Sequence, residues 1–81
     1  MNIVVLTPDK EVFQGTINSV KVPGVGGQFQ ILRGHAPLVS ALGTGEVSIT
    51  KKDGSKMSFG IDKGFVEVLR DEISLLVTGV A

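Results

Sequence analysis

Few side chains in this sequence could carry out catalysis. It contains one histidine, His35, and no cysteine, so no thiol nucleophile is available and a zinc site with several Cys and His ligands is not expected. No serine or acid sits near enough to His35 in the sequence to suggest a catalytic triad, although sequence distance alone does not exclude one. The carboxylates are scattered over predicted turns and strand faces without a matched acid–base pair. We therefore interpret His35 as a structural residue whose ring caps backbone groups inside its own loop.

Two other patterns match ligand or cofactor sites only in part. Residues 24–27, Gly-Val-Gly-Gly, lack the full spacing of a phosphate-binding loop and the helix that follows such a loop, so they are interpreted as a glycine-rich turn. The lysine pair at 51–52 stands at a predicted hairpin tip, where a biotinyl or lipoyl carrier places its modified lysine. Such carriers read Met-Lys-Met or Asp-Lys-Ala, whereas this tip reads Lys-Lys-Asp-Gly. The sequence thus predicts no enzyme activity, no cofactor, no metal and no small-molecule substrate.

Composition narrows the class of partner. The 81 residues fit one small domain, 1–81, with eight basic and eight acidic residues and a net charge of zero. Nucleic acid is not an expected partner, because its binding needs clustered Lys and Arg, and the four Phe stand without any Tyr or Trp for base stacking. The N-terminus has no basic region like that of a signal peptide, and no apolar run approaches the roughly 20 residues of a membrane span. We expect a soluble domain with no direct membrane insertion, which reaches a membrane only through a partner.

Short apolar stretches and eleven glycines predict strands rather than helices. Residues 46–50 and 56–62 alternate apolar and polar side chains with the period of two that marks half-buried strands. The Asp-Gly pair at 53–54 supplies the positive-φ residues of a tight turn, so these two strands are predicted to pair as an antiparallel hairpin. A second hairpin is predicted from strands 65–69 and 73–77, whose dense apolar content predicts burial near the centre of the fold.

Shorter predicted strands complete the fold. They lie at residues 3–6, 11–14, 17–22 and 28–32. No long stretch shows a helical apolar period free of Gly and Pro. We predict an all-β fold, a small antiparallel β-sandwich or flattened barrel of about ten short strands.

The segment between Lys21 and Glu46 is unusually poor in charge. Only Arg33 carries a full charge there, and His35 can carry a second. One interpretation is that the segment folds over the end of the sandwich and buries its own apolar groups. The other is an exposed surface that a partner covers, because large apolar patches are costly in water and interface cores are depleted in charge. The sequence leaves both open.

Four segments together resemble a known family. The run from Gly27 to Leu38, Gly-Gln-Phe-Gln-Ile-Leu-Arg-Gly-His-Ala-Pro-Leu, resembles the signature Gly-Glu-Leu-Gly-Ile-Leu-Pro-Gly-His-Ala-Pro-Leu of the epsilon subunits of F-type ATP synthases. Residues 12–15 resemble the family's early Phe-x-Gly element, and residues 45–49 the strand start that follows the signature. Residues 64–68, Gly-Phe-Val-Glu-Val, resemble its Gly-Gly-Phe-x-Glu-Val element. The resemblance covers nearly the whole chain, and Gly-His-Ala-Pro is its most specific part.

The resemblance implies a β-sandwich of about ten strands at the foot of the central stalk. In the family this domain binds the gamma subunit, rests on the polar loops of the membrane c-ring and turns with them as part of the rotor. It is non-catalytic and helps transmit torque for proton-driven ATP synthesis. The implied location is peripheral, on the cytoplasmic face of the bacterial inner membrane. Carried over by position, the c-ring-facing loop comprises Gln28, Phe29, Ile31, Leu32 and Arg33, and the gamma-facing residues are Thr7, His35, Pro37, Leu38 and Ser40.

The chain departs from the family pattern in two ways. Gln28 replaces the usual acid, Gln30 the second glycine and Arg33 the usual proline, which shifts the loop from acidic toward basic. Lys63 replaces the first glycine of the Gly-Gly pair. Family members commonly continue into two helices that can inhibit ATP hydrolysis or bind ATP, whereas this sequence stops at Ala81. We expect a naturally short form without inhibition by a helical arm.

Two alternatives belong to other functional classes. A small β-barrel module for nucleic acid or peptide would show a basic or aromatic face, which the composition does not offer clearly. An enzyme subunit or carrier would show a modification motif or a matched acid and base. We therefore expect the rotor coupling subunit.

Overall fold

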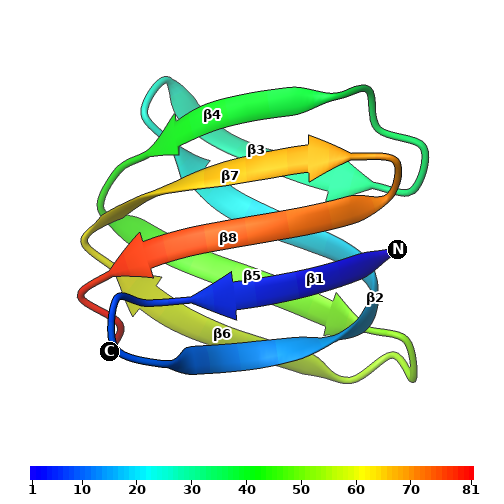
Figure 1. Cartoon of the computed structure of the whole chain (residues 1–81), viewed down its shortest axis with the longest axis horizontal. Coiled ribbons are helices and arrows are strands. Elements are labelled where there is room, and N and C mark those ends of the chain that lie inside the picture. Colours follow the sequence, from blue (N-terminus) through cyan, green and yellow to red (C-terminus); the bar gives the residue numbers. More distant parts are fainter.

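Eight β-strands and no helix make up the computed structural model, which describes residues 1–81 (Figure 1). The all-β prediction is confirmed, but the predicted number of about ten strands is wrong. No helix with the length and apolarity of a membrane span is present. The strands are β1 (Asn2–Leu6), β2 (Glu11–Gly24), β3 (Gly27–Leu32), β4 (Leu38–Leu42), β5 (Gly45–Lys51), β6 (Lys56–Ile61), β7 (Lys63–Leu69) and β8 (Glu72–Thr78).

Strand β2 is longer than predicted because Gly15 does not end it. Gly15 stays in the ladder opposite Ile3, so the predicted strands 11–14 and 17–22 are one element. The β2–β5 register shifts between Ile17 and Ser19. An irregularity of this kind bends a strand and increases its twist. β2 can therefore pair with β1 through its first half and with β3 and β5 through its second half.

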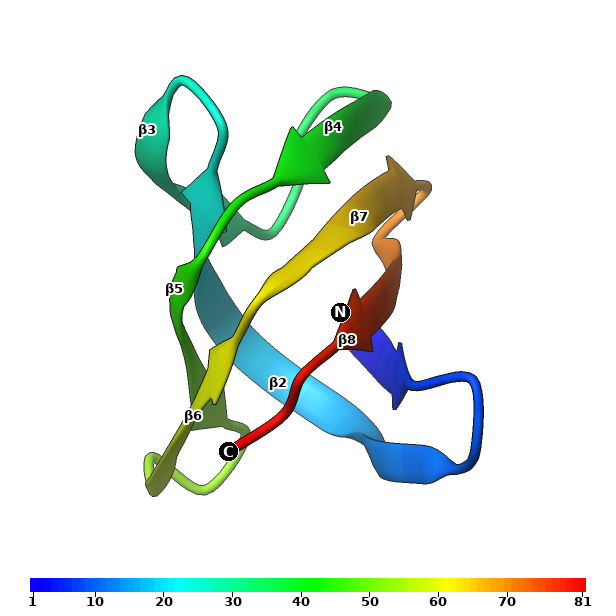
Figure 2. The same cartoon turned by 90° about the vertical axis from the view of Figure 1, so that its left-hand side faces the viewer.

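The strands form two layers that share β2. The hydrogen-bonded order is β1-β8-β7-β4-β2-β5-β6, with β3 on β2 and an additional β1–β2 pairing. β1 and β8 form the only parallel pair, and all other pairs are antiparallel. Figure 2 shows β2 crossing behind the other strands, with β5 and β6 on the left and β7 and β8 on the right. The arrangement is the predicted sandwich, almost closed into a barrel.

The core between the layers is entirely apolar. Its 16 buried residues are mostly Ile and Val, whose branched side chains pack well on pleated sheets, and no polar residue is buried with them. Both predicted hairpins are confirmed. Gly54, with φ 89°, turns β5 into β6, and the residues between β7 and β8 have φ values of 51° (Arg70) and 60° (Asp71).

Two expectations about burial and strand content are corrected. β7 and β8 were expected near the centre, but each buries only one face: Val66 and Leu75 are fully buried while their neighbours Phe65 and Leu76 are exposed. The charge-poor segment does not simply fold over the end of the sandwich, because its second half forms β4, paired along its length with β7. β4 is absent from the sequence prediction.

Candidate partner-binding surface

A row of apolar side chains crosses the outer face of the layer formed by β4, β7, β8 and β1. The strand registers place Ala41 opposite Phe65, Phe65 opposite Leu76, and Leu76 opposite Leu6. Phe65 is 59% exposed and Leu76 is 50% exposed. We call these four residues the apolar row. Exposed apolar side chains in contiguous register, rather than scattered singly, are typical of a surface that a partner covers.

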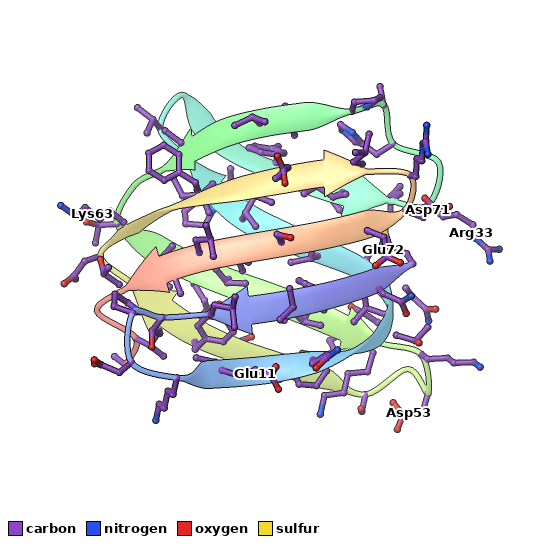
Figure 3. The ribbon with its side chains drawn as sticks, in the orientation of Figure 1. Glu11, Arg33, Asp53, Lys63, Asp71 and Glu72 are labelled. Carbon is purple, nitrogen blue, oxygen red and sulfur yellow. The ribbon has the colours of Figure 1, made fainter.

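A groove runs along the apolar row and ends at the β1–β2 turn. Its volume is about 580 Å³, and Thr7 and Pro8 of that turn line one end of it. Lys63 lies at the same end of the layer and is the only charged residue of the lining (Figure 3). Gly64 keeps the strands close here, because a Cβ at Gly64 would collide with the carbonyl oxygen of Leu76. The groove is therefore an apolar feature with one cation at its edge.

Toward its other end, the same outer face mixes polar and apolar side chains. The next row of outward side chains lies two positions along each strand from the apolar row. In it, Val39 pairs with Glu67, and Ser74 pairs with Glu67 on one side and Val4 on the other. In the row after that, Glu72 accepts a hydrogen bond of 3.4 Å from the side-chain amide of Asn2. Val39, at 70% exposure, and Leu69, at 52%, are exposed apolar side chains on this part of the face, so the apolar row is the uninterrupted part of a face that is mixed elsewhere.

The outer face of the second layer has different chemistry. Ser48 and Ser58 lie opposite each other on β5 and β6 with their hydroxyl oxygens 3.2 Å apart. Lys21 pairs with Ser48 on one side, and Lys56 pairs with Thr50 at the end of the ladder. Hydroxyls and lysines on one face and an apolar row on the other make the two faces of the sandwich unlike.

The gamma-facing residues predicted by resemblance lie at both ends of the first layer. Thr7 borders the groove, whereas His35 and Pro37 lie in the β3–β4 connection at the opposite end. Leu38 and Ser40 are half-buried and share the inner side of β4, and Leu38 packs against the core. The structure thus brings Thr7 to the apolar row and keeps the other four residues together on or beside β4.

The residues predicted to face the c-ring lie on strand β3 (Gly27–Leu32), which confirms the predicted strand at 28–32, and Arg33 follows it in the β3–β4 connection. Along β3 the side chains alternate: Gln28 and Leu32 are exposed, while Phe29 is half-buried. Ile31 has 0% exposure and belongs to the core, so its side chain presents no surface to a partner. Arg33 projects away from the end of the molecule (Figure 3).

The structural interpretation of His35 is confirmed. Its ring Nδ1 lies 2.7 Å from the carbonyl oxygen of Ala36. Since a carbonyl oxygen can only accept, Nδ1–H is the donor of this hydrogen bond. The backbone N–H of His35 also donates to the carbonyl oxygen of Leu32, at 3.1 Å. No group of three or more His, Asp or Glu side chains is placed to hold a metal ion.

Sequence reasoning missed the apolar row. A signal existed: a strand with one buried face should alternate, yet β7 begins its buried part with Phe65-Val66 and β8 contains Leu75-Leu76. Apolar residues on both faces can mean a central strand or a strand with a partner. Which face of a strand stays uncovered is decided by how all the strands of the chain pair. The local pattern therefore could not distinguish a strand buried on both faces from a strand whose outer face binds a partner.

Comparison with known proteins identifies the family. The model of the family described as ATP synthase, Delta/Epsilon chain, beta-sandwich domain matches residues 1–81. An ATP synthase epsilon chain of Chlorobaculum tepidum is 46% identical over 77 residues, which are 95% of this chain and 88% of that protein. An ATP synthase epsilon chain of Campylobacter jejuni is 39% identical over 98% of this chain and 61% of its own length.

Solved structures agree in fold. A chain in the cryo-EM structure of Euglena gracilis mitochondrial ATP synthase, which contains OSCP, F1 and the c-ring, matches with a TM-score of 0.90 at 18% identity, over 98% of this chain and 51% of that chain. A chain of the Tetrahymena thermophila central stalk and c-ring matches with a TM-score of 0.81 at 19% identity, over 100% of this chain and 65% of that chain. At such identities the likeness concerns the fold alone, but the sequence match spans the whole chain. The chain belongs to the ATP synthase delta/epsilon family and has the fold of that family's β-sandwich domain.

Proposed function

We propose that this chain is a non-catalytic subunit of the central stalk, or rotor, of an F-type ATP synthase. It joins the gamma subunit to the membrane c-ring, so that proton-driven rotation of the ring reaches the catalytic head. The observation that carries the proposal is the family match over residues 1–81. The corresponding location is peripheral, on the cytoplasmic face of a bacterial inner membrane.

The apolar row is the part of the surface best suited to gamma. Phe65 and Leu76 expose half or more of their side chains and lie in register, and aromatic and aliphatic anchors of this kind form the centre of stable interfaces. Thr7 stands at the end of the same groove. His35 and Pro37 extend the proposed gamma-facing surface into the connection before β4, while Leu38 and Ser40, on the inner side of β4, would hold that strand in place for gamma.

The c-ring contact is proposed for strand β3, in the layer opposite the apolar row, and for the start of the β3–β4 connection. Gln28 and Leu32 are exposed on β3, and Arg33 follows them in the β3–β4 connection. Phe29 would contribute its exposed part, while Ile31 would act by holding β3 on the core. Arg33 and the glutamines suit polar ring loops through hydrogen bonds rather than through a carboxylate.

A binding experiment with two matched variants tests the proposal. The gamma subunit and the c-ring of the same organism are immobilised separately, and this chain is titrated over each. Phe65→Ser is expected to weaken gamma binding about tenfold or more and to leave c-ring binding unchanged. Leu32→Ser removes an apolar side chain of similar exposure, 53%, from the other layer and is expected to do the reverse. Failure of the parent chain to bind gamma would contradict the proposal.

A further inference from the structure

The turn between β7 and β8 adopts a conformation that Arg70 does not favour and that Asp71 tolerates less readily than glycine. Leu69 pairs with Glu72, so only Arg70 and Asp71 connect the two strands, and both have positive φ, 51° and 60°. Two-residue turns of this type are normally built from Asn-Gly, Asp-Gly or Gly-Gly, because positive φ is disfavoured for other residues. Glycine at position 71 would relieve the backbone. Because aspartate tolerates positive φ, a role for Asp71 has to follow from the contacts of its side chain.

The Asp71 side chain connects the turn to a distant loop. Its carboxylate Oδ1 accepts a hydrogen bond of 2.8 Å from the backbone N–H of Gly34, which lies 37 positions earlier in the chain. Its backbone carbonyl oxygen accepts another, of 2.9 Å, from the N–H of Asn2 at the start of β1. Asp71 and Arg33 occupy the same end of the molecule (Figure 3). One turn residue therefore joins three segments.

The loop has no other hydrogen bond to hold it on the fold. Within residues 33–37, the remaining hydrogen bonds are local, from His35 N–H to the carbonyl oxygen of Leu32 and from the His35 ring to that of Ala36. Gly34 itself has φ 81°, a conformation open to glycine. Apart from the covalent links of the loop to β3 and to β4, which pairs with β7 from Leu38 onward, the carboxylate of Asp71 is its one hydrogen-bonded anchor on the β7–β8 turn.

We infer that Asp71 is a positioning residue that holds residues 34–37 in the conformation in which they meet gamma. This inference rests on the proposed function. A loop that is already ordered binds without the entropic cost of being ordered by its partner. By fixing Gly34, Asp71 also fixes the backbone of His35, whose ring is held against the carbonyl oxygen of Ala36.

Three substitutions separate this role from a general effect on folding. Asp71→Gly removes the carboxylate and relieves the positive φ. Asp71→Asn keeps an Oδ1 acceptor and a residue type that tolerates positive φ. Asp53→Gly is the matched control, because Asp53 also accepts a backbone N–H at a hairpin turn, but from Ser55 only two residues away.

Amide hydrogen exchange in the free chain and gamma affinity are then measured for each variant. In Asp71→Gly, exchange at Gly34 should become at least about tenfold faster while core amides of β7 and β8 stay protected, and gamma affinity should fall about fivefold or more. Asp71→Asn should restore both values most of the way, and Asp53→Gly should change neither. Unchanged Gly34 exchange in Asp71→Gly would overturn the anchoring role, and a loosened loop with full gamma affinity would overturn the partner role. Absence of gamma binding by the parent would overturn the proposed function, while the exchange measurement would still decide whether Asp71 holds the loop.

Discussion

Two consecutive leucines of β8 should respond oppositely to truncation. Leu75 is fully buried between the layers, whereas Leu76 points outward in the apolar row and is 50% exposed. Leu75→Ala should destabilise the fold by about 2–5 kcal/mol, the usual cost of removing a buried leucine and leaving a cavity. Full burial of a leucine is worth about 1.5–3 kcal/mol, so the half-exposed Leu76 should cost only about 1 kcal/mol or less on truncation to alanine.

The size of the domain makes this difference easy to measure. At roughly 0.05–0.15 kcal/mol per residue, 81 residues give a total stability of about 4–12 kcal/mol, of which the loss at Leu75 is a large part. The sequence has no Trp or Tyr, so urea unfolding is best followed by far-ultraviolet circular dichroism. Leu75→Ala should lower the urea midpoint by about 1 M or more at an unchanged slope, and Leu76→Ala by much less.

Binding to gamma should show the reverse order. Leu76→Ala removes part of the proposed contact surface and should weaken gamma binding, whereas Leu75→Ala should leave the affinity of the folded fraction unchanged. Equal stability losses, or a larger loss at Leu76, would refute the reasoning. They would mean that β8 is shifted by one residue, which exchanges every inward side chain for an outward one.

Three further predictions concern the glycines and the hairpin turns. Gly64→Ala should destabilise the fold by about 1–3 kcal/mol in urea unfolding, because the Cβ of the new alanine would meet the carbonyl oxygen of Leu76. Gly26→Ala is the control and should change stability little, because a Cβ there would have no atom within 4 Å. Similar losses in both variants would contradict the close approach of β7 to β8 at Gly64. Arg70→Asn should stabilise by up to about 1 kcal/mol, because asparagine tolerates the φ of 51° better, and a lower melting temperature would argue against strain there. The Ser55 hydroxyl, and then its backbone N–H, hold the pKa of Asp53 below its usual 3.8, so Asp53 contributes stability above its unfolded pKa and loses it as pH falls through the folded pKa. Asp53→Asn should thus lower the urea midpoint at neutral pH and leave it unchanged at a pH below the folded-state pKa of Asp53. An NMR titration that places the pKa of Asp53 at or above 3.8 would contradict the turn geometry.

Features encoded by neighbouring residues were predictable from the sequence. The β5–β6 hairpin follows from Asp53-Gly54 between two alternating segments, and the β7–β8 hairpin from a polar turn between two apolar segments. The cap made by the His35 ring is also local, because its acceptor belongs to the next residue. In each case the determining contacts lie within a few positions of one another.

Features that depend on distant pairing were not predictable. Gly15 was expected to end a strand, but pairing with β1 keeps it extended. β4 becomes a strand because β7 lies beside it, although its own sequence has little pattern. Ile31 was placed on a contact surface by position in a motif, whereas the alternation of β3 against the core buries it. The Gly34–Asp71 hydrogen bond spans 37 positions and leaves no local signal.

The central claim is that this chain couples rotation of the c-ring to the catalytic head. The most direct measurement is ATP-driven proton pumping by the same organism's ATP synthase in proteoliposomes, prepared without this subunit and then supplied with it. Pumping per ATP hydrolysed should be weak without the chain and restored when it is added. A folded Phe65→Ser, Leu76→Ser double variant should restore little of it. Equal pumping per ATP with and without the chain would contradict the coupling role.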